Sequence, residues 1–462
     1  MTESEETSPR LNGEHKQPNV IVFLTDQQRF DSAGVHGNPL GLTPNFDRVA
    51  SEGTHFSQMF TCQPVCGPAR SCLQTGKYAT ATGCYRNGIP LPENEKTLAH
   101  YFSEANYDTA YIGKWHLADK QAVPPSMRGG YRHWLASNTL EFSSDAYRTV
   151  LFDENEEPVR LPGYRVDALT DAAIRYIHAS SAEDKPFFLC LSFLEPHHQN
   201  HRDDFPAPDG YAQRYHGGYV PPDLAALGGN AHQQLGGYWG MVKRLDEALG
   251  RLLDALKSLD MAQDTIVLIT SDHGCHFKTR NDEYKRSCHE SSIRVPGAAI
   301  GPGFNGGGRV RGLVSLVDVA PTLLDAAGIA VPTAMQGKSV MSALRGDPVE
   351  GMNEAFIQVS ESQIGRAIRT GRWKYAVKAP DEVPRRQPYA PVYEEDCLYD
   401  LMADPYELTN LIELESHRPL ANHLRERLLF HMKAAGEVVG EIVPAPVRPS
   451  GQRSVLPDEL FE

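Results

Sequence analysis

The chain has 462 residues, of which 40% are hydrophobic and 23% are charged, and its formal net charge is −14. Single hydrophobic cores stop growing at roughly 250–300 residues, so this length predicts one large and one small domain. The acidic balance excludes a nucleic-acid-binding surface, whose footprint is basic. No apolar run approaches the roughly 18 residues of a membrane-spanning helix, which excludes an integral membrane protein.

Residues 1–17 are acidic and polar, and they lack the basic and apolar blocks of a signal peptide. We therefore expect a flexible tail there and a cytoplasmic protein. The eight cysteines, in a long chain without a signal, are typical of reduced thiols rather than of a disulfide framework. Among partners, we expect neither nucleic acid nor membrane, and a homo-oligomer remains open.

Short apolar runs alternate with longer helical patterns along the chain. The runs 19–26 and 264–272 are apolar throughout, which is typical of strands buried on both faces of a parallel sheet. The runs 108–113 and 186–194 are similar in composition. Apolar side chains recur at three- and four-residue intervals over 241–256, which predicts an amphipathic helix packed on that sheet. This alternation indicates an α/β fold.

Polar side chains follow the carboxyl end of each of these four runs. In chain order these residues are Asp26, Lys114, His116, His197, Asp272 and His273. In open α/β sheets, ligands bind beyond the carboxyl ends of the strands. We therefore expect two acids, three histidines and a lysine to meet at one rim of the sheet.

After residue 345 the pattern changes to short strand-like pieces, separated by turns and followed by one helical stretch over 418–436. We expect residues 18–345, which hold the candidates above, to form the catalytic domain. Residues 346–442 are expected to form a smaller α+β domain with a short antiparallel sheet. The Pro-rich residues 443–462 are predicted to be an irregular C-terminal arm.

Three cysteines lie close together in the stretch TCQPVCGPARSCLQTGKY, residues 61–78. A zinc or iron–sulfur cluster needs ligand spacing such as a repeated C-x2-C, which these cysteines do not show. Burial as small apolar side chains is the simpler interpretation for Cys62, Cys72 and Cys84. Cys66 differs, because it begins the sequence Cys-Gly-Pro-Ala-Arg.

The residues after Cys66 have the signals of a short helix. Pro68 suits the first turn of a helix and Gly76 suits its end, so a helix is predicted over 68–75, with Cys66 just before its N-terminus. The positive end of that helix would face an incoming anion. Arg70, one turn into the helix, would then be placed to hold residue 66 and a neighbouring carboxylate, although without the cysteine motif a surface arginine would be the simpler interpretation.

The sequence CGPARSCLQTG, residues 66–76, resembles the signature of the type I sulfatases in the alkaline-phosphatase-like superfamily, in which C-x-P-x-R is followed by a leucine and T-G. In that family a maturation enzyme oxidises the cysteine to formylglycine (3-oxoalanine), and the hydrated aldehyde is the nucleophile. The resemblance implies this modification at Cys66 and a transient encounter with that enzyme. Cys62 does not qualify, because its own C-x-P-x continues to Cys66 instead of an arginine.

Further family segments follow in the family's order from Asn19 to Leu411, among them NVIVFLTDQQR, GKWHL, EPHH, TSDHG and YKRSCHESSIRVP. They imply an alkaline-phosphatase-like fold with a large, mixed and mostly parallel sheet flanked by helices. They also imply one divalent metal ion. The ligands implied for this ion are Asp26, Gln27, Cys66, Asp272 and His273.

This ligand set departs from the family's pattern at two positions. Gln27 stands where most relatives have an aspartate, and His273 stands where many have an asparagine. Carboxylate and carbonyl oxygens suit Ca²⁺, whereas an imidazole ligand shifts the preference toward Mn²⁺ or Zn²⁺. The resemblance places Ca²⁺ first.

The resemblance also implies roles in catalysis. The hydrated aldehyde at position 66 attacks sulfur, while the metal ion, Lys114 and Lys285 neutralise the sulfate oxygens. His197 contacts the substrate and protonates the leaving alcohol. His116 then takes a proton from residue 66, so that sulfate is expelled and the aldehyde regenerates. Further candidates for the substrate pocket are Asn87, His198, His201 and His289.

The sequence therefore predicts a formylglycine-dependent sulfatase that hydrolyses the sulfate ester of a carbohydrate, an aryl alcohol or an alkyl alcohol. The alternative is a phosphonate monoester hydrolase or phosphodiesterase, because Asp26-Gln27, Asp272-His273 and CGPAR also resemble that branch. GKWHL favours the sulfatase. A third alternative is a pseudoenzyme that binds sulfated ligands without turnover, and the intact cysteine signature argues against it.

Overall fold

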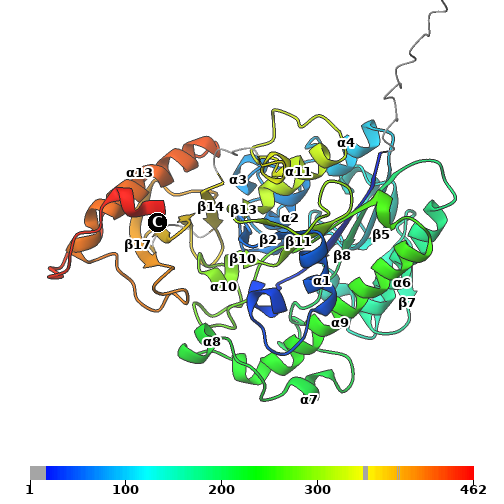
Figure 1. Ribbon diagram of the computed structural model, residues 1–462, viewed down its shortest axis with the longest axis horizontal. Coiled ribbons are helices and arrows are strands. Elements are labelled where there is room, and N and C mark those ends of the chain that lie inside the picture. Colours follow the sequence, from blue (N-terminus) through cyan, green and yellow to red (C-terminus); the bar gives the residue numbers. More distant parts are fainter. Residues whose placement is uncertain (1–16, 347–351, 382, 384–385, 462) are drawn as a thin grey trace, which may run out of the picture.

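The computed structural model describes residues 17–346, 352–381, 383 and 386–461, and Figure 1 shows how they are arranged. A ten-stranded sheet crosses the larger part of the molecule, with the strand order β12-β2-β11-β9-β1-β8-β4-β5-β6-β7. The predicted flexible tail lies outside the described residues, apart from Gln17.

The four predicted apolar runs form neighbouring parallel strands at the centre of this sheet. β1 (Asn19–Thr25) pairs with β8 (Phe187–Ser192) on one side and with β9 (Thr265–Ser271) on the other. β4 (Asp108–Lys114) pairs with β8, and β5 (His133–Ser137) pairs with β4, again in parallel. Every side chain of β1, β8 and β9 is buried, which confirms the predicted sheet.

Antiparallel pairs near both edges make the sheet mixed. β11 runs antiparallel to β9 and β2, and β6 runs antiparallel to β5 and β7. The predicted fold class, a large and mostly parallel mixed sheet flanked by helices, is confirmed. The outer strands are β2 (Thr54–Phe56), β11 (Gly297–Ile300), β12 (Gly308–Val310), β6 (Thr149–Phe152) and β7 (Pro158–Leu161).

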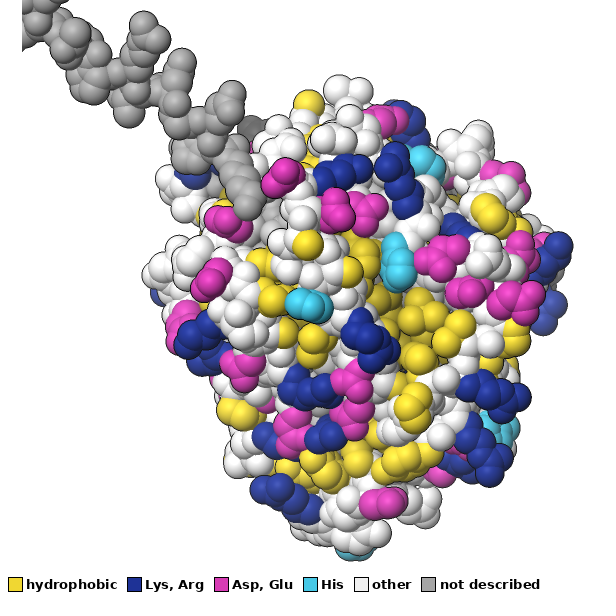
Figure 2. Space-filling model, turned by 90° about the vertical axis from the view of Figure 1, so that its right-hand side faces the viewer, with side chains coloured by type: hydrophobic (Ala, Val, Ile, Leu, Met, Phe, Trp, Pro, Cys, Tyr) yellow, Lys and Arg dark blue, Asp and Glu magenta, His cyan; other side chains and the backbone are white. Residues whose placement is uncertain are grey.

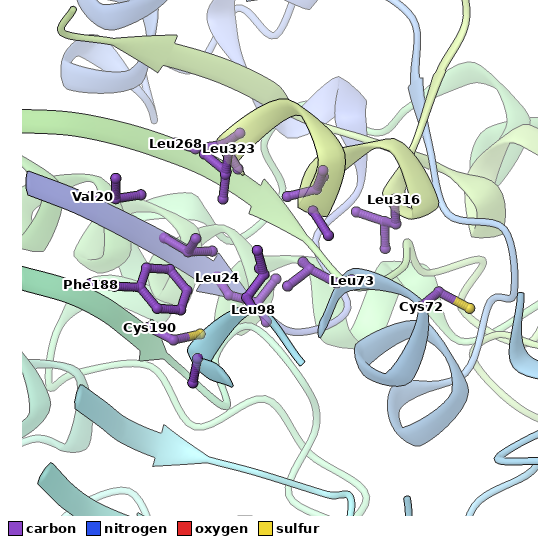
Figure 3. Packing of buried hydrophobic residues seen from close by; sticks show 14 of the residues in the cluster. Val20, Leu24, Cys72, Leu73, Leu98, Phe188, Cys190, Leu268, Leu316 and Leu323 are labelled. Carbon is purple, nitrogen blue, oxygen red and sulfur yellow. The ribbon is translucent and has the colours of Figure 1, made fainter. Parts of the chain in front are cut away.

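Helices cover both faces of the sheet, which is why its central strands are apolar throughout. Successive side chains of a strand point to opposite faces, so Val20 packs in one buried cluster with Leu73 (Figure 3), and Ile21 packs in another with Leu249. The helices of the first face are α2 (Cys66–Thr75), α4 (Leu98–Glu104) and α11 (Val319–Ala326), and those of the second are α1 (Pro44–Glu52), α6 (Arg165–Ser180) and α9 (Ala231–Ser258).

Several shorter elements connect these layers. A second, three-stranded sheet has the order β10-β3-β13. The short strands and helices are β3 (Met59–Phe60), β10 (Arg294–Val295), β13 (Val314–Ser315), α3 (Ala79–Thr82), α5 (Leu140–Ser143), α7 (Tyr211–Tyr215), α8 (Pro222–Ala226), α10 (Glu290–Ile293) and α12 (Met341–Leu344).

The C-terminal part forms its own five-stranded sheet with the order β14-β15-β16-β17-β18. Its first four strands are antiparallel, as predicted, and β18 lies parallel to β17. The boundaries expected at residues 345 and 442 stay predictions. The elements are β14 (Glu354–Val359), β15 (Gly365–Thr370), β16 (Trp373–Lys378), β17 (Val392–Asp400), α13 (Arg418–Ala434) and β18 (Glu441–Val443).

The side of the molecule shown in Figure 2 carries α6 and β7, and hydrophobic side chains gather at its centre with charged ones around them. A cavity of about 650 Å³ is lined by Asp108, His133 and Tyr176, among others. Asp108 and His133 begin β4 and β5, so this cavity lies at the amino ends of the strands, opposite to the predicted site. Among the described helices, none is both long and apolar enough to cross a membrane.

A buried ion cluster links the C-terminal sheet to helix α10 of the larger part. The Nζ of Lys374 on β16 lies 2.8 Å from a carboxylate oxygen of Glu290 on α10 and 2.5 Å from one of Glu407. The Lys374 side chain is fully buried. Burial opposes the ionisation of Glu290, but Lys374 and Arg369 hold its pKa below the usual range. The segment that contains Lys285 is therefore fixed to the C-terminal sheet through charges that need one another.

Replacing Lys374 by methionine should lower the free energy of unfolding by about 3–5 kcal/mol, because two buried carboxylates lose their shared cation. Lys378→Met is the matched control on the same strand. Lys378 pairs with Asp396 at the surface, where such pairs contribute about 0–1 kcal/mol. Urea unfolding followed by circular dichroism measures both, and equal losses would show that the buried cluster is not special.

Candidate active site

Polar residues at the ends of four neighbouring strands meet at the carboxyl rim of the main sheet. Asp26 follows β1, Asp272 and His273 follow β9, Lys114 ends β4, and His197 lies shortly after β8. Because β9, β1, β8 and β4 are adjacent and parallel, these side chains come together. The structure thus has the rim that the strand ends predicted.

Cys66 is the first residue of α2, and Val65 is the N-cap. The helix thus begins earlier than the predicted 68–75, because a proline fits the first turn without the loss of a helical hydrogen bond. It ends before Gly76, whose left-handed φ of +67° agrees with the prediction. All residues of α2 are buried, so its N-terminal N–H groups lie inside the protein beside the site.

Arg70 holds the two carboxylates of the rim in place. Its Nη2 donates to Asp26 Oδ2 at 2.9 Å, and its Nε donates to Asp272 Oδ2 at 3.1 Å. Its Nη1 donates to the Ser192 hydroxyl at 2.6 Å and to the Lys114 carbonyl at 2.8 Å. The side chain is only 1% exposed, so these charged hydrogen bonds are shielded from water.

Four ligand atoms suited to a metal ion lie within 4.8 Å of one another, on Asp26, Cys66, Asp272 and His273. His273 Nδ1 lies 2.9 Å from the Gly274 carbonyl, which can only accept, so Nδ1 carries the proton and Nε2 keeps its lone pair. That Nε2 lies 3.6 Å from one oxygen of each aspartate and 3.3 Å from the Cys66 sulfur.

The charges of this group fit a divalent cation. Burial and the neighbouring Asp26 raise the pKa of Asp272 to about 6, because two carboxylates are forced together without water. A bound cation would remove this repulsion. The backbone N–H of Gln27 donates to Asp272 Oδ1 at 3.1 Å, and its amide oxygen lies 3.5 Å from Lys285 Nζ, on the side of Cys66.

The surroundings of Cys66 stabilise a negative charge at this position. Lys285 Nζ donates to the Cys66 sulfur at 3.0 Å, and Lys114 Nζ donates to the adjacent Asp26 at 2.8 Å. Burial by itself would raise the pKa of the thiol, but the positive charges of Lys114 and Lys285 lower it well below its usual range. An anionic oxygen in place of the sulfur would be stabilised in the same way.

His197 and Lys285 form a hydrogen-bonded pair beside Cys66. His197 Nδ1 donates to the His198 carbonyl at 2.6 Å, so its Nε2 accepts from Lys285 Nζ at 2.9 Å. Burial and the charge of Lys285 lower the pKa of His197. The ring is therefore neutral in the free protein, with Nε2 turned toward Lys285 and the site.

Glu141 was missed by the sequence analysis, and it lies inside the site. It belongs to α5, which follows β5, and its Oε1 lies 3.0 Å from Lys114 Nζ and 3.9 Å from His116 Nδ1. The strand-end rule would have found it, but the strand HWLAS, residues 133–137, has only three consecutive apolar residues, too short a run to mark it. Ser192, the last residue of β8, was also missed.

Gln27, His116 and Arg286 lie around the site and have a left-handed backbone, with φ of +67° at Gln27 and +62° at His116 and Arg286. This conformation costs a residue with a side chain about 1–3 kcal/mol, and such residues cluster at functional sites. The left-handed backbone at His116 turns the chain back toward β5, and the one at Arg286 follows directly after Lys285. Both changes of direction carry a predicted site residue into the group around Cys66.

A cavity of about 580 Å³ opens above Cys66, and its lining includes Asn87, His116, Glu141, His197, His198 and Lys285. Asn87 Oδ1 accepts from the Gly67 N–H at 3.0 Å, so Asn87 lies at the start of α2. His198 stacks on His197, with ring centroids 4.3 Å apart. His201 and His289 do not line this cavity, since His201 is 54% exposed and His289 lies buried against Tyr399.

Comparison with known proteins decides the family. The family model described as Sulfatase matches residues 18–329, which is more than half of the chain. The chain belongs to the sulfatase family. A second family model, N-sulphoglucosamine sulphohydrolase, C-terminal, matches residues 282–434. The protein is therefore a hydrolase of sulfuric esters. This family implies a divalent metal ion, and the buried Asp, Cys and His group is suited to one.

The sulfatase is similar to several proteins that are named for different substrates. It is 30% identical over 448 residues to an ulvan-active sulfatase from Formosa agariphila, with 92% of this chain and 83% of the relative covered. Its fold matches a protein solved with its substrate D-glucosamine-2-N,6-O-disulfate, at a TM-score of 0.76, 24% identity, and coverage of 91% and 98%. A phosphonate monoester hydrolase from Silicibacter pomeroyi shares the fold, at a TM-score of 0.68, 21% identity, and coverage of 90% and 95%.

Replacing Asp26 or Asp272 by alanine should lower the metal affinity of the sulfatase by more than about 10-fold, since even residues behind the ligands contribute that much. Elemental mass spectrometry of the protein after gel filtration measures its metal content and checks this prediction. The control is Asp246→Ala, because Asp246 is buried but accepts hydrogen bonds from Asn45 and Phe46 away from the site. Wild-type metal content in the Asp26 and Asp272 variants would show that both acids are structural.

Proposed function

We propose that this sulfatase removes sulfate from a sulfated saccharide, with formylglycine at position 66 and one divalent metal ion, Ca²⁺ before Mn²⁺ or Zn²⁺. The observation that carries this proposal is the positive charge around Cys66, where Lys285 Nζ lies 3.0 Å from the sulfur and Lys114 and Arg70 both bind Asp26. A saccharide is supported by the names of the ulvan-active relative and of the neighbour solved with a glucosamine disulfate.

The size of the cavity agrees with a small saccharide. Its volume of about 580 Å³ falls within the usual range of small-molecule sites, roughly 300–1,000 Å³. Its wall includes polar side chains such as Asn87, Asn200 and Asp203, which can bind hydroxyl groups. These features support a saccharide over an alkyl sulfate with an apolar chain.

A formylglycine hydrate at position 66 would supply the nucleophilic oxygen. The residues around it would hold that oxygen as an anion, because the same residues lower the pKa of the Cys66 thiol. Cys66 is only 1% exposed in the folded chain, so the maturation enzyme would have to reach it before folding is complete. Arg70 would keep Asp26 and Asp272 beside the nucleophile throughout.

The metal ion would be held by Asp26, Asp272, His273 and the amide oxygen of Gln27, next to residue 66. Bound there, it would polarise the sulfate oxygens as a Lewis acid. Three oxygen ligands favour Ca²⁺, and the imidazole of His273 is the ligand that keeps Mn²⁺ and Zn²⁺ open. Lys114 and Lys285 would neutralise the remaining charge of the sulfate group.

The two histidines would divide the proton transfers. His197 would take up a proton at Nε2 when the anionic substrate binds and give it to the leaving alcohol, since its Nε2 and Lys285 Nζ lie together on the cavity side of Cys66. His116 would take a proton from residue 66, so that sulfate leaves. His116 lines the same cavity as Cys66, which supports this role.

Specific observations favour the sulfatase over the two alternative functions, a phosphonate monoester hydrolase and a pseudoenzyme. A phosphonate monoester hydrolase shares the fold, but at 21% identity that likeness extends to the fold alone. The segment GKWHL, which resembles the sulfatase version of the anion site, supports the sulfatase, because its Lys114 binds Asp26 and its His116 lines the cavity above Cys66. A pseudoenzyme would not need the full set of Arg70 hydrogen bonds that align the carboxylates with Cys66.

Peptide mass spectrometry of residues 61–78 should show conversion of Cys66 to the aldehyde, and no conversion of Cys62 or Cys72, when a maturation enzyme is co-expressed. Cys66 alone has a proline two residues and an arginine four residues later. The converted protein should release sulfate from sulfated saccharides, and Cys66→Ala should not. Conversion at another cysteine would contradict the assignment, and faster turnover of a phosphonate monoester would favour the alternative.

The leaving group separates the roles of the two histidines. His197→Ala should lower kcat for an alkyl sulfate by about 10²–10⁴-fold, the usual contribution of a positioned acid, and affect an aryl sulfate far less. His116→Ala should slow both substrates equally and leave protein that carries covalent sulfate, seen by intact mass. Equal losses on both substrates for His197→Ala, or no retained sulfate for His116→Ala, would show that these roles are wrong.

A further inference from the structure

Two polar atoms in the site are buried without a hydrogen-bond partner among the described residues, Nδ1 of His116 and Oε2 of Glu141. Buried polar atoms are nearly always paired, because an unpaired one loses its hydrogen bonds to water and gains none in return. These two belong to side chains that face each other, since the other oxygen of Glu141, Oε1, lies 3.9 Å from His116 Nδ1. One atom is on a ring that can donate and the other is on a carboxylate that accepts.

The fold sets these two residues opposite each other. His116 follows β4 and Glu141 follows β5, which are parallel neighbours in the sheet. The His116 N–H donates to the Asn138 carbonyl at 2.7 Å, which fixes the backbone of His116 against the segment that leads into α5. Both side chains line the cavity above Cys66, and both are buried, at 8% and 4% exposure. Neither can find its missing partner in bulk water.

The position of His116 gives the two ring nitrogens different neighbours. His116 and Cys66 line the same cavity, and the His116 nitrogen that lies near Glu141 is Nδ1. Nε2 is then the nitrogen that is left to act on residue 66. The order across the site is residue 66, the imidazole of His116 and the carboxylate of Glu141. A nucleophile, a base and a group that orients the base have this arrangement in many unrelated hydrolases.

We propose that Glu141 is a positioning residue, which acts by accepting a hydrogen bond from His116 Nδ1 when the site closes on substrate. This inference rests on the proposed function. Hydrogen bonds of catalytic groups are often long before substrate binds, and a shift of about 1 Å would bring this one to the usual length. It would fix the tautomer of His116 with Nε2 free to accept.

The proposed step balances in protons and electrons. His116 Nε2 takes the proton from the free hydroxyl of residue 66, and the electron pair of that O–H bond forms the carbonyl. The bond from residue 66 to the sulfate oxygen breaks, and its electron pair leaves with sulfate. The positive charge that arises on the imidazole ring is stabilised by the Glu141 carboxylate, which stays ionised.

A different role for Glu141, as a partner of Lys114 alone, explains less. Lys114 Nζ already donates to Asp26 Oδ2 at 2.8 Å, so it does not depend on Glu141 for a counter-ion. A carboxylate beside a sulfate site also repels the substrate. If Glu141 served only as a second counter-ion of Lys114, like Asp26, nothing would offset this repulsion. Stabilising a transient positive charge on His116 gives the carboxylate a use that a neutral side chain would lack.

The first test compares Glu141→Gln with wild type after the conversion of Cys66. We expect kcat to fall about 10²-fold or more for aryl and alkyl sulfates alike, with KM falling in parallel and kcat/KM changed little, because the loss falls on the expulsion of sulfate, after the ester bond has broken. Intact mass should show covalent sulfate retained on the variant. Glu154→Gln is the matched control, since Glu154 pairs with His133 at 2.8 Å outside the site, and its kinetics should equal wild type.

A double-mutant cycle identifies the residue through which Glu141 acts. In a His116→Ala background, Glu141→Gln should cost nothing further, whereas in a Lys114→Ala background it should still cost about its full effect. The reverse pattern would overturn the proposal in favour of Lys114. Unchanged kcat in folded Glu141→Gln would also overturn it. Thermal unfolding of each variant shows whether it is folded.

A spectroscopic test separates this inference from the proposed function. In ¹⁵N-histidine-labelled protein, the signal that disappears in His116→Ala should be that of a neutral ring protonated at Nδ1, and Glu141→Gln should shift it. The experiment uses inorganic sulfate as the bound anion and needs no turnover, so it decides the contact even if no sulfate ester is cleaved. A signal unaffected by Glu141→Gln would overturn the inference, while absent sulfatase activity in wild type would overturn the proposed function alone.

Discussion

The site depends on two buried carboxylates at the ends of adjacent parallel strands, which one arginine keeps ionised and aligned. Asp26 and Asp272 would repel each other in a dry rim, and the raised pKa of Asp272, about 6, shows the remaining strain. Arg70 reaches both from the first turns of α2, so the helix that presents Cys66 also carries their counter-ion. Residue 66 therefore cannot move relative to the carboxylates without breaking buried charged hydrogen bonds.

The second constraint comes from the C-terminal sheet. Lys285 lies in the long connection between β9 and α10. The residue after it, Arg286, donates a hydrogen bond at 3.1 Å to Glu361, which belongs to the C-terminal part of the chain. Glu361 also accepts from the N–H of Asn87 at 3.2 Å, so one acid of the C-terminal part contacts both sides of the cavity. With the Lys374 cluster behind α10, this explains why the smaller sheet packs where it does.

Strong local patterns made much of the fold and the rim predictable from sequence. β1 and β9 have apolar side chains on both faces because both faces are buried. Asp26 and Asp272, which directly follow these strands, were therefore readily found. Glu141 was not, because β5 lies next to the antiparallel edge of the sheet and only some of its side chains are buried. The start of α2 was predicted two residues too late, because Gly67 and Pro68 are compatible with either a cap or a first turn. Contacts between distant segments, such as that of Arg286 with Glu361, leave no local signal at all.

The three histidines around residue 66 differ in the group that lies next to Nδ1. His273 and His197 have main-chain carbonyls behind Nδ1, at 2.9 and 2.6 Å, which fix a neutral tautomer with Nε2 inward. A neutral ring is what a metal ligand requires, and His197 can accept from Lys285 only in this form. His116 alone has a carboxylate behind it, and a carboxylate stabilises a ring that becomes positive, whereas a carbonyl does so much less. In our proposal, the division of roles among three chemically identical side chains follows from the groups next to Nδ1, and the base is the histidine that lies beside Glu141.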